Sequence, residues 1–286
     1  MSSRPHTAPA VTPFPHRGAW LFFNLLSLDA PSVAVAWQLL FAKSMHIPVT
    51  PAAVLALAVA VWLIYAADRL LDVFRAPVPL PTRRHQFHRA HGQTLLLASV
   101  AALCLLFALC PFLRPAVIGY GAALSGIVAL YFCVIHLLPV AAQQWCPKEL
   151  AVGIVFAIGT CLAPWTRLAN PLQFVAPACL FAALCCLNCV AIEAWEWHRY
   201  GARSSSRPHA VTLWLSQRLR PLFTFIALMA TLLFFTVGAH LLFAAIGLSS
   251  LAFLWLEKEQ HRIPADLLRV LADLPLLSPL LLIGLR

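Results

Sequence analysis

The chain has 286 residues, of which 62% are apolar and only 10% are charged, and its mean hydropathy is +0.84. A soluble domain carries about 25% charged residues, so this composition excludes one and predicts an integral membrane protein. The net charge of +10 at pH 7 would also suit a nucleic-acid binder. However, the positive residues follow the ends of apolar segments, and we therefore expect membrane lipid and not nucleic acid as the partner.

Apolar runs of about 17 to 25 residues predict about nine membrane-spanning helices in one all-α bundle. Residues 1–18, rich in Pro, Ser, Thr and His, predict a disordered cytoplasmic tail, and residues 19–286 a single transmembrane domain. The first span is too long, and too polar at Asn24 and Asp29, to be a cleaved signal peptide. The expected spans are 20–43, 51–72, 93–112, 115–138, 149–166, 171–196, 219–237, 239–256 and 267–285.

The basic residues lie almost all on one side of these spans. Of the 20 Lys and Arg, all but four fall in the N-terminal segment or in the even-numbered connections; the exceptions are Lys43, Arg114, Arg167 and Arg286. The positive-inside rule therefore places the N-terminus and the even connections in the cytoplasm of a multi-pass protein, which we expect in the cell inner membrane. The acidic residues gather at the same ends, although negative charge does not follow that rule. They predict a polar cavity, and hence an active site, that opens to the cytoplasm.

Two aspartates interrupt the end of the second apolar run. Asp68 and Asp72 are spaced i,i+4, so on a helix they lie one above the other on one face. They repel each other and also meet the negative end of the helix dipole. A divalent cation would relieve both effects.

Asp29 precedes Pro31 within the first span, and two interpretations remain open. The carboxylate caps a helix that begins at the proline, or it faces the polar cavity.

A basic connection follows the second span. Its prolines prevent regular helix until about Pro81, and Thr82 is a suitable cap for a short basic helix. His85, His88 and His91 are candidate metal ligands, but their spacing rotates them off one face and the neighbouring arginines disfavour a cation. We favour an anion site in which Arg83, Arg84 and Arg89 reach phosphate. The alternative is an ordinary positive-inside loop.

The fifth span begins at Pro147-Lys148-Glu149 and continues through Gly153, Phe156 and Gly159. Small residues at this spacing permit close contact between helices. Lys148 lies at the cytoplasmic mouth, where it either snorkels to the interface or binds phosphate.

The sixth span ends with Asn188, Glu193 and Glu196. At 100° per residue these side chains form a broad arc that lines one side of a cavity. A carboxylate this close to the membrane interior costs free energy, and these residues are therefore candidates for a functional role. The chain therefore carries two acidic helix ends, after the second and sixth spans, each followed by a basic loop.

Of the nine cysteines, eight lie inside expected spans, which favours small packing residues over disulfides. Cys186 and Cys189 form a C-x-x-C, but without a second pair a metal site is the less favoured interpretation.

These features resemble the UbiA superfamily of intramembrane aromatic prenyltransferases. The family pattern has about nine helices, with an aspartate-rich motif after the second and another after the sixth. Asp68 and Asp72 match the two aspartates of N-x-x-x-D-x-x-x-D, with Ile64 in place of the asparagine. Glu193 and Glu196 occupy the region of the second motif, D-x-x-x-D, with a shifted spacing. The segment from Lys148 to Gly159 looks like the family's lysine followed by G-x-x-F-x-x-G, so the likeness covers most of the chain in topology but only three segments in residues.

The resemblance implies a cofactor, Mg²⁺, and two partners, a prenyl diphosphate and a lipophilic acceptor. Asp68 and Asp72 would bind one metal ion, and Glu193 and Glu196 another, as the catalytic carboxylates. The diphosphate-binding set that it implies comprises Arg69, Arg83, Arg84, Lys148 and Asn188. The expected reaction is transfer of an isoprenoid chain to an aromatic or other lipophilic acceptor. Two alternatives remain: a terpene cyclase with the same fold, and a non-catalytic protein that binds or transports lipid, which the missing asparagine at Ile64 favours.

Overall fold

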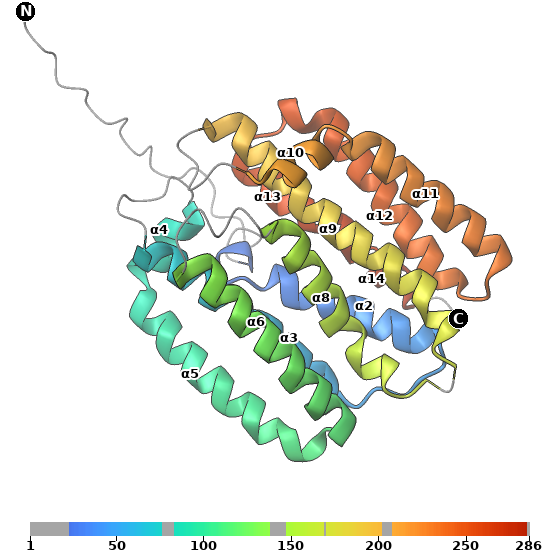
Figure 1. Cartoon of the computed structure of the whole chain (residues 1–286), viewed down its shortest axis with the longest axis horizontal. Helices are drawn as coiled ribbons and strands as arrows, with labels where there is room; N and C mark the ends of the chain where they lie inside the picture. The colour runs from blue at the N-terminus through green and yellow to red at the C-terminus, as the bar shows by residue number, and fades with distance from the viewer. Residues whose placement is uncertain (1–22, 76–82, 138–146, 169, 202–207, 285–286) are drawn as a thin grey trace, which may run out of the picture.

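The computed structural model describes residues 23–75, 83–137, 147–168, 170–201 and 208–284, and every regular element in these ranges is helical (Figure 1). Seven of the described helical segments are long and apolar enough to cross a membrane: Pro51–Phe74, Gly92–Phe112, Pro115–Leu137, Lys148–Trp165, Leu172–Arg199, Leu219–Thr236 and His240–Arg262. This confirms the prediction of a polytopic all-α membrane protein. The expected tail, residues 1–18, lies outside the described residues.

The first half of the chain places α3 between the central helices and a peripheral layer. Proline occupies the first position of both α3 and α6, where its fixed φ suits a helix and its missing N–H is not needed. α3 packs against α2, α5 and α4, and α6 packs against α8. The elements are α2 (Asp29–Ser44), α3 (Pro51–Arg75), α4 (Arg83–Ala90), α5 (Gly92–Leu109), η1 (Cys110–Phe112) and α6 (Pro115–Leu137).

The second half is arranged around α9, which lies between α8 and the pair α11 and α12 in Figure 1. Proline again precedes the long helices: Pro147 and Pro171 are the N-cap residues of α8 and α9. The elements are α8 (Lys148–Trp165), α9 (Leu172–Tyr200), α10 (Ala210–Ser216), α11 (Leu219–Thr236), α12 (His240–Glu259), η3 (Gln260–Arg262), α13 (Ala265–Asp273), η4 (Pro275–Leu277) and α14 (Pro279–Leu282).

The first expected span is shorter than predicted and the last is broken, so the expected count of nine membrane-spanning helices is not confirmed. α2 has 16 residues and begins at Asp29, after a backbone turn in which Ser27 has a φ of 59°. Near the C-terminus, Pro275 and Pro279 divide the chain into α13, η4 and α14. A proline cannot donate the backbone hydrogen bond that a continuous helix needs, which explains the breaks.

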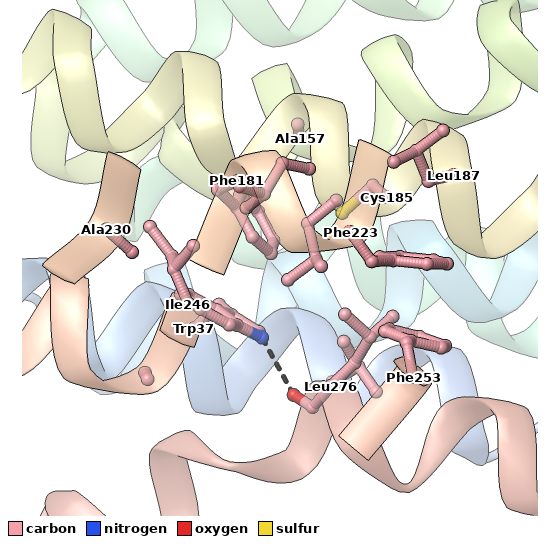
Figure 2. Close-up of a cluster of buried hydrophobic side chains, with 14 of the residues drawn as sticks. Trp37, Ala157, Phe181, Cys185, Leu187, Phe223, Ala230, Ile246, Phe253 and Leu276 are labelled. Carbon is pink, nitrogen blue, oxygen red and sulfur yellow. Dashed lines mark hydrogen bonds between the residues drawn. The ribbon is translucent and has the colours of Figure 1, made fainter. Parts of the chain in front are cut away.

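The core joins the N-terminal helix α2 to the second half of the chain (Figure 2). The ring of Trp37 stacks on Phe181 of α9 with centroids 4.3 Å apart, and its Nε1 donates to the carbonyl of Leu276, 2.7 Å away. Phe223 of α11 stacks on Phe253 of α12 at 4.8 Å. By contrast, α5 and α6 leave most of their apolar side chains exposed, as helices that face lipid do.

Candidate functional site

Charged side chains from three helices meet beside Lys148, the first residue of α8. We call the group Asp68, Asp72, Lys148, Glu149 and Glu193 the outer charged cluster. The Nζ atom of Lys148 lies 3.6 Å from Glu193 Oε2 and 3.9 Å from Glu149 Oε1. Asp72 and Asp68 of α3 are also near enough to act electrostatically on this ammonium group. Both acidic segments that the sequence singled out therefore converge on one lysine.

Glu149 is the most buried member of the outer charged cluster, with 4% of its side chain exposed. Its Oε2 accepts a hydrogen bond of 2.6 Å from the hydroxyl of Thr212, in the short helix α10. Its Oε1 has no hydrogen-bond partner among the described residues and faces the Lys148 ammonium. α10 thus fixes the carboxylate that, in turn, helps to hold the lysine.

Asp68 has a neighbour that the sequence did not indicate. His136, at the end of α6, places its Nε2 atom 3.7 Å from Asp68 Oδ1. The imidazole is 6% exposed, whereas the Asp68 side chain is 42% exposed. The two residues are 68 positions apart, so only the packing of α6 near α3 brings them together. A histidine at the end of an otherwise apolar run was the signal available in the sequence.

Glu196 turns away from the outer charged cluster. It forms an ion pair with Arg269 of α13, and 20% of each side chain is exposed. The two glutamates of the expected second motif are therefore separated: Glu193 faces Lys148 and Glu196 faces Arg269. Side chains three residues apart on a helix point in directions that differ by about 60° around its axis, so Glu193 and Glu196 of α9 reach different neighbours.

The fit to Mg²⁺ differs between the two expected ligand pairs. Within the described ranges, no group of three or more His, Cys, Asp or Glu side chains is arranged to hold a metal ion. Mg²⁺ is nevertheless commonly held by one or two carboxylates together with substrate phosphates, and the partly exposed pair Asp68 and Asp72 suits that mode. Glu193 and Glu196 fit less well, because each already has a cationic partner.

The described part of the basic connection forms the short helix α4, which packs against α3 and α5, whereas Pro81 and Thr82 lie outside the described residues. Within α4, His88 is buried and Arg89 is exposed; the ring of His91, the N-cap residue of α5, stacks on Phe87 with centroids 4.4 Å apart. His88 and His91 therefore have different environments, one buried and one exposed, and the His85 side chain lies outside the described part of the structure. The backbone of Arg83 and Arg84 belongs to this helix, but their side chains lie outside the described part of the structure.

A second group of polar residues, all buried except the partly exposed Asp273, lies between the start of α2, the last third of α3, the middle of α9 and the end of α13. We call Asn24, Ser27, Asp29, Arg69, Asn188 and Asp273 the buried polar cluster. Asn24 Nδ2 donates to Asp29 Oδ2 at 2.7 Å, and the other oxygen of Asp29 accepts from the Ala30 amide at 3.0 Å. The N-cap of α2 is Leu28 and Asp29 is the first residue of the helix, so Asp29 does not cap a helix that begins at Pro31; its carboxylate instead joins this polar group.

Arg69 and Asn188 belong to this buried polar cluster. Arg69 is 5% exposed, and its Nη1 donates to the Asn24 carbonyl at 3.1 Å and to the Ser27 hydroxyl. Asn188 Nδ2 donates to Asp273 Oδ1 at 3.3 Å. Two residues of the expected diphosphate-binding set are thus engaged away from Lys148.

Asp29 and Asp273 lie close enough for their carboxyl groups to act on each other electrostatically. Asp273 ends α13, outside the seven candidate spans. Burial raises the pKa of Asp273 well above the ordinary value of an aspartic acid, and the Asp29 carboxyl raises it further.

The described cysteines are free thiols. Cys186 Sγ donates to the Leu150 carbonyl at 3.6 Å, and Cys161 and Cys185 are buried in the core. These contacts agree with a packing role.

No family model, curated protein or solved structure matches the chain. The function must therefore be argued from the residues of this chain alone.

Proposed function

We propose that the chain is a divergent UbiA-like prenyltransferase, which transfers an isoprenoid chain from a prenyl diphosphate to a lipophilic acceptor within the membrane. The observation that carries the proposal is the convergence of Asp68, Asp72 and Glu193 on Lys148. A diphosphate bound there would lie beside the Lys148 ammonium group and beside the carboxylates of Asp68 and Asp72. The seven candidate membrane-spanning helices among the described residues support a polytopic bundle of this kind.

Each residue of the outer charged cluster has a role in this proposal. Lys148 donates to a diphosphate oxygen and stabilises the negative charge that develops as the diphosphate leaves. Asp68 and Asp72 are the residues that would hold Mg²⁺. When bound, the metal neutralises the leaving diphosphate. The isoprenoid carbon–oxygen bond breaks with its electron pair on the diphosphate, the acceptor bonds to that carbon, and the acceptor loses a proton.

Glu193 positions Lys148, because its Oε2 atom lies 3.6 Å from the ammonium nitrogen. Glu149, held by Thr212, keeps the ammonium group at the end of α8. The surrounding apolar helices keep water away from the reactive allylic carbon.

The pairing of Glu193 with Lys148 and of Glu196 with Arg269 favours a second candidate, a non-catalytic protein that binds an anionic lipid. In that case Lys148 would bind the lipid phosphate without a metal. The two candidates differ in whether binding depends on Mg²⁺.

The test is equilibrium binding of farnesyl thiolodiphosphate, a donor analogue that resists hydrolysis, to the full-length protein in detergent with Mg²⁺ or with a chelator. We expect Mg²⁺-dependent binding that is lost in Asp72→Asn. In Lys148→Met the affinity should fall about tenfold to a hundredfold, the worth of a hydrogen bond to a charged group. The matched control is Glu259→Gln, whose carboxylate pairs with Arg262 at a distance of 2.9 Å, outside the cluster.

Metal-independent binding that requires Lys148 would overturn the transferase and favour the lipid-binding candidate. Absence of binding in both conditions would reject both. If Mg²⁺-dependent binding is found, incubation with farnesyl diphosphate and no acceptor separates transfer from cyclisation, because only a cyclase would then release a cyclic hydrocarbon or alcohol.

A further inference from the structure

One side of α11 carries an exposed row of large apolar residues. They recur every three or four positions, as one side of a helix does, and each is more than half exposed: Phe225, Leu228, Leu232 and Phe235. We call these four residues the apolar strip. The opposite side of the helix, which includes Phe223 and Ile226, is buried in the core. Because α11 is one of the candidate membrane spans, lipid chains are the natural cover for the apolar strip.

Two arginines lie at one end of the apolar strip. Arg218 is the N-cap residue of α11, and Arg220 lies in its first turn. Residues two apart on a helix differ by about 200° around its axis, so the two side chains start from opposite edges of the exposed face. Both are exposed, and in the part of the chain that the structure describes neither is paired with a carboxylate. Two uncompensated positive charges therefore lie at the head of an apolar surface.

The guanidinium group of Arg218 is held in place by Trp214 of α10. Its Cζ atom lies 4.3 Å from the centroid of the indole ring, and its Nη1 donates to the Trp214 carbonyl at 3.2 Å. The tryptophan is 53% exposed, as tryptophans at a membrane–water interface commonly are. α10 is itself anchored, because the buried Thr212 donates to Glu149. A guanidinium stacked on a fixed ring presents its remaining N–H groups in one plane, which suits a phosphate.

Charge and length identify the molecule that fits this surface. Leu228 lies ten residues beyond Arg218, or about 15 Å along the helix, which is the depth of one leaflet of a bilayer. A phospholipid has the same layout, with a phosphate at one end and apolar chains of this length. A phosphatidylcholine head group would also bring an ammonium group beside the two arginines, as a like charge, whereas a phosphatidylglycerol head group brings no cation. A lipid of net negative charge is therefore the better match.

We propose that an anionic phospholipid binds to the outer surface of α11, with its phosphate held by Arg218 and Arg220 beside Trp214 and its acyl chains against the apolar strip. Binding here goes beyond the function proposed above and requires no diphosphate at the outer charged cluster. It is also separate from the lipid phosphate considered for Lys148, which lies at the start of a different helix.

The test uses the full-length protein in detergent and a phosphatidylglycerol probe that carries a diazirine in one acyl chain. Light attaches the probe to nearby residues, and mass spectrometry of peptides locates it. We expect saturable labelling of α11 that unlabelled phosphatidylglycerol suppresses at a concentration about five- to 25-fold lower than phosphatidylcholine with the same chains, about fivefold for each arginine. Equal suppression by the two lipids, or labelling confined to other helices, overturns the proposal.

Substitutions test the residues that hold the phosphate. The double variant Arg218→Gln with Arg220→Gln should lower the preference for phosphatidylglycerol below about twofold, since both charges are removed. Trp214→Leu should lower it about two- to fivefold, the worth of an exposed cation–π contact, whereas Trp214→Tyr, which keeps an aromatic ring, should retain it. The matched control is Arg262→Gln at the end of the neighbouring α12, because this guanidinium already pairs with Glu259 at 2.9 Å. A full preference in the double variant or in Trp214→Leu overturns the proposal.

Two further measurements separate this site from other phosphate sites. Glycerol 3-phosphate, which has the phosphate but no acyl chains, should not suppress the labelling of α11; suppression would assign the arginines to a soluble phosphate compound and overturn the lipid. Asp72→Asn, which is expected to abolish binding of farnesyl thiolodiphosphate, should leave the labelling of α11 unchanged. Loss of labelling in Asp72→Asn would place the probe at the outer charged cluster and contradict the site on α11.

Discussion

Lys148 shows how a single side chain connects distant parts of the chain. It belongs to α8, but its ammonium group pairs with Glu193 of α9 and lies near Asp68 and Asp72 of α3. Negative charges that would repel one another are thereby held at one end of the bundle. The sequence predicted a lysine at a helix mouth, but its partners depend on how α3, α8 and α9 pack.

For this single residue, we predict that Lys148→Met lowers the free energy of unfolding by about 1–3 kcal/mol, because the carboxylates of Glu149 and Glu193 lose the cation beside them. The cost is smaller than for a fully buried pair, since 36% of the lysine side chain is exposed. Thermal unfolding in detergent measures the change. The double variant Lys148→Met with Glu193→Gln should recover about 1 kcal/mol, because one uncompensated charge is removed. Strict additivity of the two substitutions would mean that the pair is not coupled.

At the scale of elements, the contact between α8 and α9 depends on Gly153. A Cβ atom at this position would lie 2.6 Å from the backbone N and Cα atoms of Cys186. The sequence predicted close helix contact at Gly153 and Gly159 alike, but a Cβ atom at Gly159 would meet only the Leu124 side chain, at 3.4 Å. The closest approach therefore occurs at one end of the motif, near Lys148.

We predict that Gly153→Ala lowers the free energy of unfolding by about 1–3 kcal/mol, because the added methyl group forces the two helix backbones apart. Loss of farnesyl thiolodiphosphate binding should accompany it, since the separation moves Lys148 relative to Glu193. Gly126→Ala is the control, because nothing lies within 4 Å of a Cβ atom there. Equal melting temperatures for the two variants would contradict the close contact.

At the scale of the whole molecule, two of the four basic residues that depart from the positive-inside pattern have structural partners. Lys43 Nζ donates to the Ile283 carbonyl at 2.6 Å, and Arg114 donates to the Thr166 carbonyl at 3.1 Å. Thr166 is the C-cap of α8, where carbonyl groups lack intrahelical partners. These cations therefore satisfy carbonyl groups, which accounts for their position on the less basic side.

The distribution of basic residues also predicts how the bundle is oriented in the membrane. Reporter domains fused after His46 or Gly238 should be exported, whereas fusions after Gly201 or His261 should remain in the cytoplasm, because the basic connections stay inside. Activity of an export-dependent reporter at each position measures this. The opposite pattern would place the outer charged cluster on the external face and contradict a cytoplasmic site.

The sequence alone determined the class of protein, the long apolar helices and the side on which charge gathers, because these follow from local hydrophobicity and from residues next to each other in the chain. Most helix boundaries agree with the expected ones within a few residues; for example, α3 was expected over 51–72 and extends to Arg75. The pair Asp68 and Asp72 was visible for the same reason, since its i,i+4 spacing is local.

Only the tertiary structure decided which charged residues share a site. Arg69 follows Asp68 directly, yet its side chain turns to Asn24 and Ser27, because adjacent residues on a helix point about 100° apart. Glu193 and Glu196 separate toward Lys148 and Arg269 for a similar reason. Asp29 and Asp273 come from opposite ends of the chain and lie close enough to act on each other electrostatically. No local pattern encodes such a contact, because it arises from the packing of α2 and α13 against the same central helices.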